Sequence, residues 1–188
     1  MATLLIIGLV VGVIALLLVL WIIGSYNSLV QQRALTDEAF SGMDVQLKRR
    51  YDLIPNLVAT VKQYAGHEKD IFENVTRLRA AALGAQTIDQ KIEAEKGLTS
   101  ALKTLFAVAE NYPNLKANEN FQHLQKELSA LEHELQLSRR YYNGAARNYN
   151  IKIASFPSSI IASIFNFLRV PYFEVTSAQE RENPGVKF

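Results

Sequence analysis

Residues 121–149 read FQHLQKELSALEHELQLSRRYYNGAARNY and contain the clearest repeat in the chain. Steps of three and four residues connect a series in which Ser138 is the one small polar member: Phe121, Leu124, Leu128, Leu131, Leu135, Ser138, Tyr142, Ala145 and Tyr149. A sustained repeat of this kind is typical of a helix that packs along other helices. Asn118 is a candidate N-cap, and Pro157 ends the pattern at about Ser155. The repeat therefore predicts one long helix over residues 118–155.

The sequence before this repeat also has helical periodicity, and no stretch between residues 25 and 156 has the alternation of a strand. Asp52 and Thr87 are candidate N-caps, Pro55 would lie in a first turn, and Gly84 would be a C′ glycine. The pattern predicts four helices, over residues 25–51, 52–83, 87–109 and 118–155. An alternative is that Pro55 only kinks one long helix over residues 25–83.

An apolar stretch precedes the predicted bundle. Residues 4–23, LLIIGLVVGVIALLLVLWII, carry no charge, and about 20 apolar residues are enough to cross a bilayer core. No basic residue comes before the stretch and no small-x-small cleavage site follows it, which favours a retained anchor over a cleaved signal. Gly8 and Gly12 form a GxxxG pattern, which either lets two membrane helices approach closely or reflects the abundance of Gly in such helices.

The orientation of the anchor follows from the basic residues on its C-terminal side. Arg33 and the cluster Lys48-Arg49-Arg50 come after the apolar stretch, and no Lys or Arg comes before it. Because basic residues near a membrane helix favour the cytoplasmic side, we expect the N-terminus outside and the bundle in the cytoplasm.

A second apolar segment follows the long repeat. One helical face of this segment would hold Ile160, Ile161, Ile164, Phe165 and Leu168. If the four predicted helices alternate in direction, the last returns this segment to the bilayer surface, whereas a single kinked helix over residues 25–83 would leave it far away. The apolar face would contact lipid, or it would cap the bundle or pack on a neighbouring subunit.

These segments predict an all-α fold: an N-terminal transmembrane helix, an antiparallel up-and-down four-helix bundle and a C-terminal amphipathic helix. The expected divisions are a transmembrane anchor (1–24), a helical bundle domain (25–157), an amphipathic apolar segment (158–173) and a polar flexible tail (174–188).

Composition and motifs argue against several functions. Twenty Lys and Arg against 18 Asp and Glu give a net charge of +2, too even a balance for nucleic-acid binding. The sequence has no Cys, no GxSxG, no HExxH and no phosphate-binding Gly loop. A di-iron bundle needs Glu-x-x-His on two helices, and no Glu here is followed by a His three residues later. We expect no catalytic residue, no cofactor and no metal site.

Polar side chains interrupt the apolar stripes of the first and last predicted helices. The first group is Arg33, Asp37, Asp44 and Arg50; the second is Arg139, Arg140, Tyr142 and Asn143. If the two helices are neighbours, acids of the first would face arginines and tyrosines of the second. Such a layer would fix the register of the bundle, contact another subunit or form an active site.

Several of these stretches together resemble the LemA family: DVQLKRR (44–50), DLIPNLV (52–58), AVAENYP (107–113), LKAN (115–118), RRYYN (139–143) and YFE (172–174). The resemblance spans nearly the whole soluble part, in order. It implies a bacterial envelope protein with one N-terminal transmembrane helix and an up-and-down four-helix bundle. It implies no reaction.

The combined expectation is a non-enzymatic scaffold, anchored in the bacterial envelope, that self-associates and contacts membrane lipid. The alternative is an adaptor that presents partners to an envelope protease or another membrane enzyme.

Overall fold

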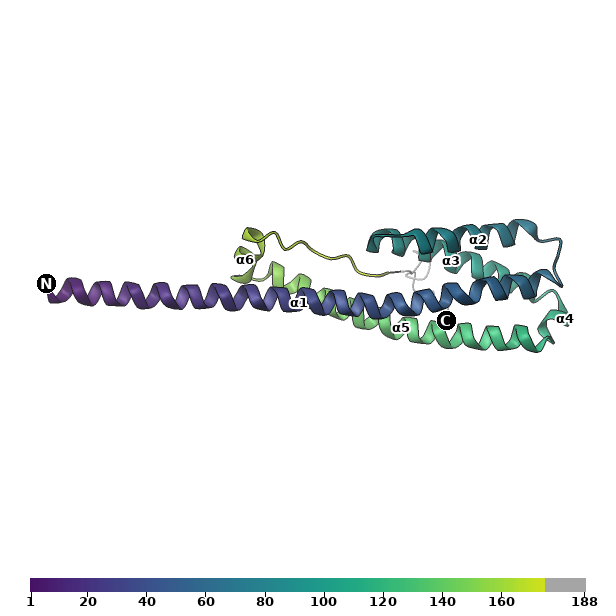
Figure 1. Cartoon of the computed structure of the whole chain (residues 1–188), viewed down its shortest axis with the longest axis horizontal. Helices are drawn as coiled ribbons and strands as arrows, with labels where there is room; N and C mark the ends of the chain where they lie inside the picture. The colour runs from purple at the N-terminus through teal and green to yellow at the C-terminus, as the bar shows by residue number, and fades with distance from the viewer. Residues whose placement is uncertain (175–188) are drawn as a thin grey trace, which may run out of the picture. The chain divides into compact units, whose positions relative to one another are not determined.

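The computed structural model describes residues 1–174, and it is all-helical in that range. Six helices follow one another over these described residues (Figure 1): α1 (Ala2–Lys62), α2 (Lys69–Gly84), α3 (Ile88–Ala109), α4 (Pro113–Lys116), α5 (Glu119–Ala154) and α6 (Ser158–Ile164). The predicted fold class is confirmed, because a long apolar N-terminal helix leads into a helical bundle. Apart from Glu174, the tail predicted at 174–188 lies outside the described residues.

The chain forms two compact units. Residues 1–40 and 142–170 make up the first, here called the anchor unit. The second, here called the bundle unit, contains residues 41–141 and continues from residue 171. Helices α1 and α5 each contribute to both units, so each unit is described separately below.

The long repeat is one helix, as predicted. In the bundle unit, α5 buries Phe121, Leu128 and Leu135, and in the anchor unit it buries Tyr142 and Tyr149. These five side chains follow one another at seven-residue intervals, which keeps them on a single face of the helix. The Asn118 Oδ1 atom accepts a hydrogen bond from the Phe121 backbone N–H at 3.0 Å, so the predicted N-cap is confirmed.

Helices α2 and α3 form a close pair in the bundle unit (Figure 1). Thr87 begins α3 with a capping box, in which its Oγ1 accepts from Gln90 N at 3.2 Å and Gln90 Oε1 accepts from Thr87 N at 3.2 Å. Gly97 faces α2 so closely that a Cβ there would lie 3.1 Å from Leu78 Cδ2. Gly84 is the last residue of α2, but no described glycine has a positive φ, so its predicted C′ role is wrong.

The predicted helix start at Asp52 is also wrong, because α1 continues through Pro55 to Lys62. Proline has no N–H, so it leaves the carbonyl of Tyr51, four residues earlier, without its helical donor. The Arg79 Nε atom of α2 donates to this carbonyl oxygen at 2.6 Å. The turn comes later, at residues 63–68, and α2 remains a separate helix.

The apolar segment after α5 is only partly helical. The predicted helical face included Phe165 and Leu168, but α6 ends at Ile164. Asn166 has a φ of 57°, a left-handed conformation that does not continue a helix. Side chains of α5 then hold the extended backbone: Tyr149 OH donates to the Leu168 carbonyl at 3.0 Å, and the Asn150 amide makes two hydrogen bonds to the Val170 backbone at 2.9 and 3.0 Å.

Candidate functional site

Four charged side chains meet inside the bundle unit. Arg50 of α1 donates from Nη1 to Glu95 Oε2 of α3 at 2.9 Å, and it lies 3.6 Å from Glu132 Oε2 of α5. Arg139 of α5 lies 3.6 Å from the same Glu95 oxygen and donates to Glu132 Oε1 at 3.4 Å. The two arginines and two glutamates alternate, so each charge has opposite charges as neighbours. We call this set the charge cluster.

The charge cluster is mostly shielded from water. The Glu95 side chain is 0% exposed and that of Arg50 is 7% exposed, whereas Glu132 is 35% exposed. Buried charges are costly unless they are paired and hydrogen-bonded. Thr99 Oγ1 accepts a further hydrogen bond from Arg50 Nη2 at 3.3 Å, and the Phe173 ring lies 5.7 Å from Arg139 Cζ. These contacts from three helices and the extended segment partly compensate for the lost hydration.

Tyr51 borders the charge cluster and is a neutral group. Burial raises the pKa of its hydroxyl well above the usual value of about 10, and the adjacent Glu95 carboxylate raises this pKa further. The hydroxyl therefore keeps its proton at neutral pH and is not a general base. Within the part of the chain that the structure describes, the buried Arg139 Nε atom has no hydrogen-bond partner.

The structure brings together only part of the predicted polar layer. Arg50 and Arg139 share two partners, Glu95 of α3 and Glu132 of α5, and neither of these is an acid predicted on α1. Asp44 instead pairs with Lys48 at 3.5 Å and with Lys91 of α3. Arg140 is exposed at the surface of α5.

The other predicted polar residues lie in the anchor unit. Arg33 Nε is 3.2 Å from Asp37 Oδ1, and the Arg33 guanidinium lies 5.7 Å from the centre of the Tyr149 ring. Tyr142 is fully buried, and its ring meets that of Phe40 edge-on at 5.6 Å. Asn143 is half-buried.

The sequence analysis missed Glu95, although the pattern of α3 contains a signal for it. Ile88, Leu102 and Ala109 are separated by multiples of seven residues, and Glu95 occupies the one remaining place in this series. A carboxylate at a seam position is expected to have a buried cationic partner. The sequence does not say which of its many Lys and Arg residues fills that role.

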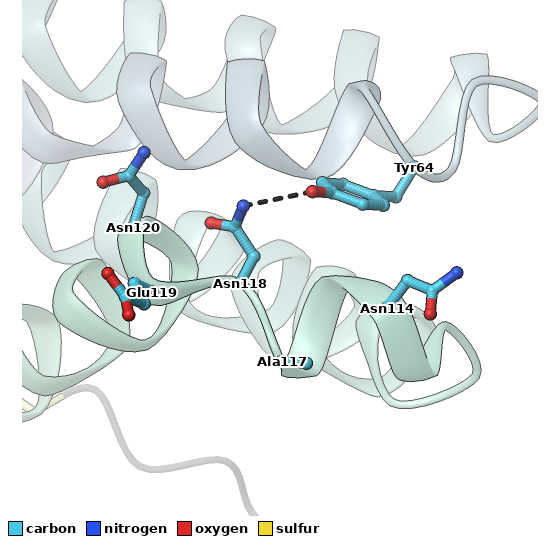
Figure 2. A pocket seen from close by; sticks show the side chains of 6 residues that line it. All are labelled: Tyr64, Asn114, Ala117, Asn118, Glu119 and Asn120. Carbon is cyan, nitrogen blue, oxygen red and sulfur yellow. Dashed lines mark hydrogen bonds between the residues drawn. The ribbon is translucent and has the colours of Figure 1, made fainter.

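A shallow hollow lies at the end of the bundle unit where α1 stops and α5 begins. It has a volume of about 600 Å³ and is lined by Tyr64, Asn114, Ala117, Asn118, Glu119 and Asn120. Figure 2 shows Asn118 turned toward Tyr64, whose hydroxyl accepts a hydrogen bond from Asn118 Nδ2 at 3.1 Å. Amide groups and one carboxylate suit hydrogen bonding to a polar surface. Over residues 1–174, no three His, Asp or Glu side chains are grouped so that they would hold a metal ion.

A second hollow of about 460 Å³ runs between α1 and α5 in the bundle unit. Three of its lining residues are apolar, namely Leu53, Ala130 and Leu131, and the others are Gln46, Arg49, Asp52, Glu127 and Glu134. Three carboxylates against one guanidinium make the polar part of the lining acidic. A lining of apolar and acidic residues suits an amphipathic helix that carries basic residues.

The anchor unit has an exposed apolar surface. One described helix, α1, is long and apolar enough to cross a membrane, and the side chains of its apolar stretch are exposed. Gly8 and Gly12 lie on this helix with nothing of the same chain near the place of a Cβ. In α6, Ile161 is buried, whereas Ile160 and Ile164 are exposed, as are Phe165 and Leu168 after it.

Comparison with known families matches residues 39–188 to the profile of the LemA family, which is most of the chain. The chain belongs to the LemA family. The match begins before the end of α1 and includes all of α2 to α6, so the charge cluster and both hollows lie in the LemA region. With its N-terminal apolar helix, the chain is a membrane-anchored LemA-family protein.

Relatives of this LemA-family chain are distant in sequence. It is 27% identical over 175 residues to Magnetosome protein MamQ 2 of Paramagnetospirillum magneticum, a match that covers 79% of this chain and 64% of that protein. Protein LemA of Metamycoplasma hominis is 24% identical over 159 residues, covering 84% of this chain and 72% of that protein. The chain thus spans a little under two thirds of the length of its MamQ relatives.

Proposed function

We propose that this LemA-family chain is a non-enzymatic scaffold that self-associates in the bacterial inner membrane, with the anchor spanning once and the bundle in the cytoplasm. The observation that carries the proposal is the free surface around Gly8 and Gly12. A Cβ at either position would meet no atom of the same chain. The same is true of Gly24, so the proposal depends also on the four-residue spacing, which puts Gly8 and Gly12 on one side of the helix, where small residues let a second anchor approach closely.

The interior of the bundle unit is consistent with a scaffold. The charge cluster balances two guanidiniums with two carboxylates, and its most buried member, Glu95, is already engaged by Arg50. A buried, internally paired network fixes the register of helices in some proteins. In this proposal, the charge cluster keeps the bundle rigid, and the anchor concentrates copies in the plane of the membrane.

The test is the mass of the full-length protein in mild detergent, measured by light scattering behind a sizing column. The unaltered chain is expected as a discrete multimer, and Gly8→Ile with Gly12→Ile is expected to reduce the protein mass toward the 21.1 kDa of one chain. Branched side chains at these positions would hold two anchors apart.

Gly24→Ile is the matched control. Gly24 has the same open surroundings, but it lies roughly 120–160° around the helix from the other two glycines. This variant should keep the multimer. A monomeric unaltered chain, or equal losses in all the variants, would contradict self-association through this face.

The alternative is an adaptor that presents partners to an envelope protease or another membrane enzyme. The hollow between α1 and α5, which is lined by apolar and acidic residues, favours this alternative. The same mass measurement separates the two functions when it is combined with crosslinking in membranes. A monomer that crosslinks to one distinct protein favours the adaptor, and crosslinks between identical chains favour the scaffold.

A further inference from the structure

We infer that residues 156–168 form a second membrane contact, in which the outer face of α6 and the residues beside it dock on the lipid headgroup boundary next to the anchor. This inference concerns a lipid surface and does not depend on self-association. It begins from the chemistry of α6. Its inner face buries Ser158, Ile161 and Ala162, yet its outer face carries Ile160 and Ile164.

The outer apolar face has no explanation within the single chain. Ile160 and Ile164 are separated by one helical turn and lie on the same side, and Ile164 is 67% exposed. Phe156, just before α6, is 82% exposed, and Phe165, just after it, is 51% exposed. A helix with apolar side chains on both sides needs protein or lipid on both sides to shield them from water. A contiguous apolar patch of this kind marks a membrane or protein contact.

Charge identifies the cover as lipid. No residue from Ile153 to Leu168 is charged, and the first charged residues on either side are Lys152 and Arg169. A charge-free apolar segment between two basic residues suits a bilayer surface, because the apolar side chains enter the acyl boundary and the cations meet anionic headgroups.

The position of the patch within the anchor unit supports the same conclusion. The Phe165 ring lies 4.8 Å from that of Tyr26 of α1, and the Phe167 ring lies 5.8 Å from it. Tyr26 comes three residues after Ile23, the end of the apolar stretch, which is about 4.5 Å along the helix axis. Aromatic rings at the end of a membrane helix sit at the headgroup level. The contact with Tyr26 therefore holds residues 156–168 at the surface that the anchor has just left.

The test places an indole in the patch of the full-length chain, reconstituted in vesicles of phosphatidylcholine with a minor share of phosphatidylglycerol. Trp21 is the one tryptophan of the chain, so a Trp21→Phe background is silent. Phe165→Trp and, separately, Ile164→Trp introduce the probe. Leu35→Trp is the control, because Leu35 is also exposed on α1 of the anchor unit but lies about 18 Å beyond Ile23.

Two quenchers distinguish the surroundings of each probe. Lipids brominated on the upper acyl chain should reduce the emission of the probes at 164 and 165 several-fold more than that at 35, whereas acrylamide in the water should do the reverse. Probes at 164 and 165 that respond like the one at 35 would overturn the inference. Probes shielded from both quenchers would also overturn it, because a protein surface would then cover the patch. Circular dichroism of each variant verifies that the helices are retained.

Discussion

At the scale of single residues, Glu95 is the side chain on which the charge cluster depends. It is the most buried of the four, and both arginines reach it. Removing one partner of a buried ion pair costs about 3–5 kcal/mol, since the remaining charges stay buried and unpaired. We expect Glu95→Gln to lower the free energy of unfolding by about this amount, measured by urea denaturation of the full-length chain in mild detergent.

Glu93→Gln is the control for this measurement. Glu93 lies on the same helix, its side chain is 80% exposed, and it pairs only loosely with Lys96 at 3.5 Å. Its replacement should change the free energy of unfolding by no more than about 0.5 kcal/mol. Equal effects of the two substitutions would show that the charge cluster contributes no more than a surface ion pair.

Tyr51 gives the protein a pH dependence at the alkaline end. Its pKa is raised in the folded state by burial and by Glu95, so the folded state holds the proton more tightly than the unfolded state, where the pKa is about 10. The protonated Tyr51 hydroxyl therefore makes its full contribution to the free energy of unfolding below about pH 10. As the pH rises further, the free energy of unfolding falls by up to about 1.4 kcal/mol per pH unit.

We expect Tyr51→Phe to remove this part of the alkaline loss of stability. Urea denaturation at several pH values above 10 should show that the free energy of unfolding declines less steeply with pH in Tyr51→Phe than in the unaltered chain. Tyr141→Phe, at an exposed position of the same unit, should leave the decline unchanged. Identical slopes for the unaltered chain and Tyr51→Phe would contradict the assignment of Tyr51 as the responsible group.

At the scale of helices, the effects of Pro55 and Arg79 on the Tyr51 carbonyl are coupled. The proline removes the donor for the Tyr51 carbonyl, and Arg79 of α2 supplies another at 2.6 Å. A buried acceptor that loses its donor costs about 1–3 kcal/mol. We expect Arg79→Met to cost that much in the unaltered chain and clearly less when combined with Pro55→Ala, because alanine restores the backbone N–H.

A double-mutant cycle on unfolding free energies measures this coupling directly, with about 1–2 kcal/mol expected. Additive effects of the two substitutions would mean that Arg79 stabilises α2 independently of the proline. The hydrogen bond from Arg79 to the Tyr51 carbonyl also explains how a proline lies inside α1 without ending it. The Pro55 ring removes one backbone hydrogen bond of α1, and Arg79 of α2 replaces it.

At the scale of the whole molecule, the long uncharged stretches and the buried charges lie in different units. The two longest uncharged stretches, residues 2–32 and 153–168, both lie in the anchor unit. The bundle unit contains the charge cluster and the hollow between α1 and α5, whose lining includes three carboxylates. The proposals follow this division, because lipid contact and self-association are assigned to the anchor unit and the alternative adaptor surface to the bundle unit.

The sequence by itself determined the helices and the anchor. Apolar periodicity is a local property, so it revealed α3 and α5 nearly to the residue, and the caps at Thr87 and Asn118 are local hydrogen bonds. The length of the apolar stretch at 4–23 likewise needs no tertiary partner to be recognised.

The tertiary structure alone decided three further features, each of which depends on a residue distant in the sequence. Helix α1 continues through Pro55 because Arg79 of α2 donates a hydrogen bond to the Tyr51 carbonyl, which the proline leaves without its helical donor. Arg50 and Arg139 share Glu95 because the fold brings this residue of α3 within reach of both α1 and α5. The segment after Asn166 is held in place because the Asn150 side chain of α5 binds the Val170 backbone. Local periodicity cannot reveal these contacts, since their energy comes from groups that only the folded chain brings together.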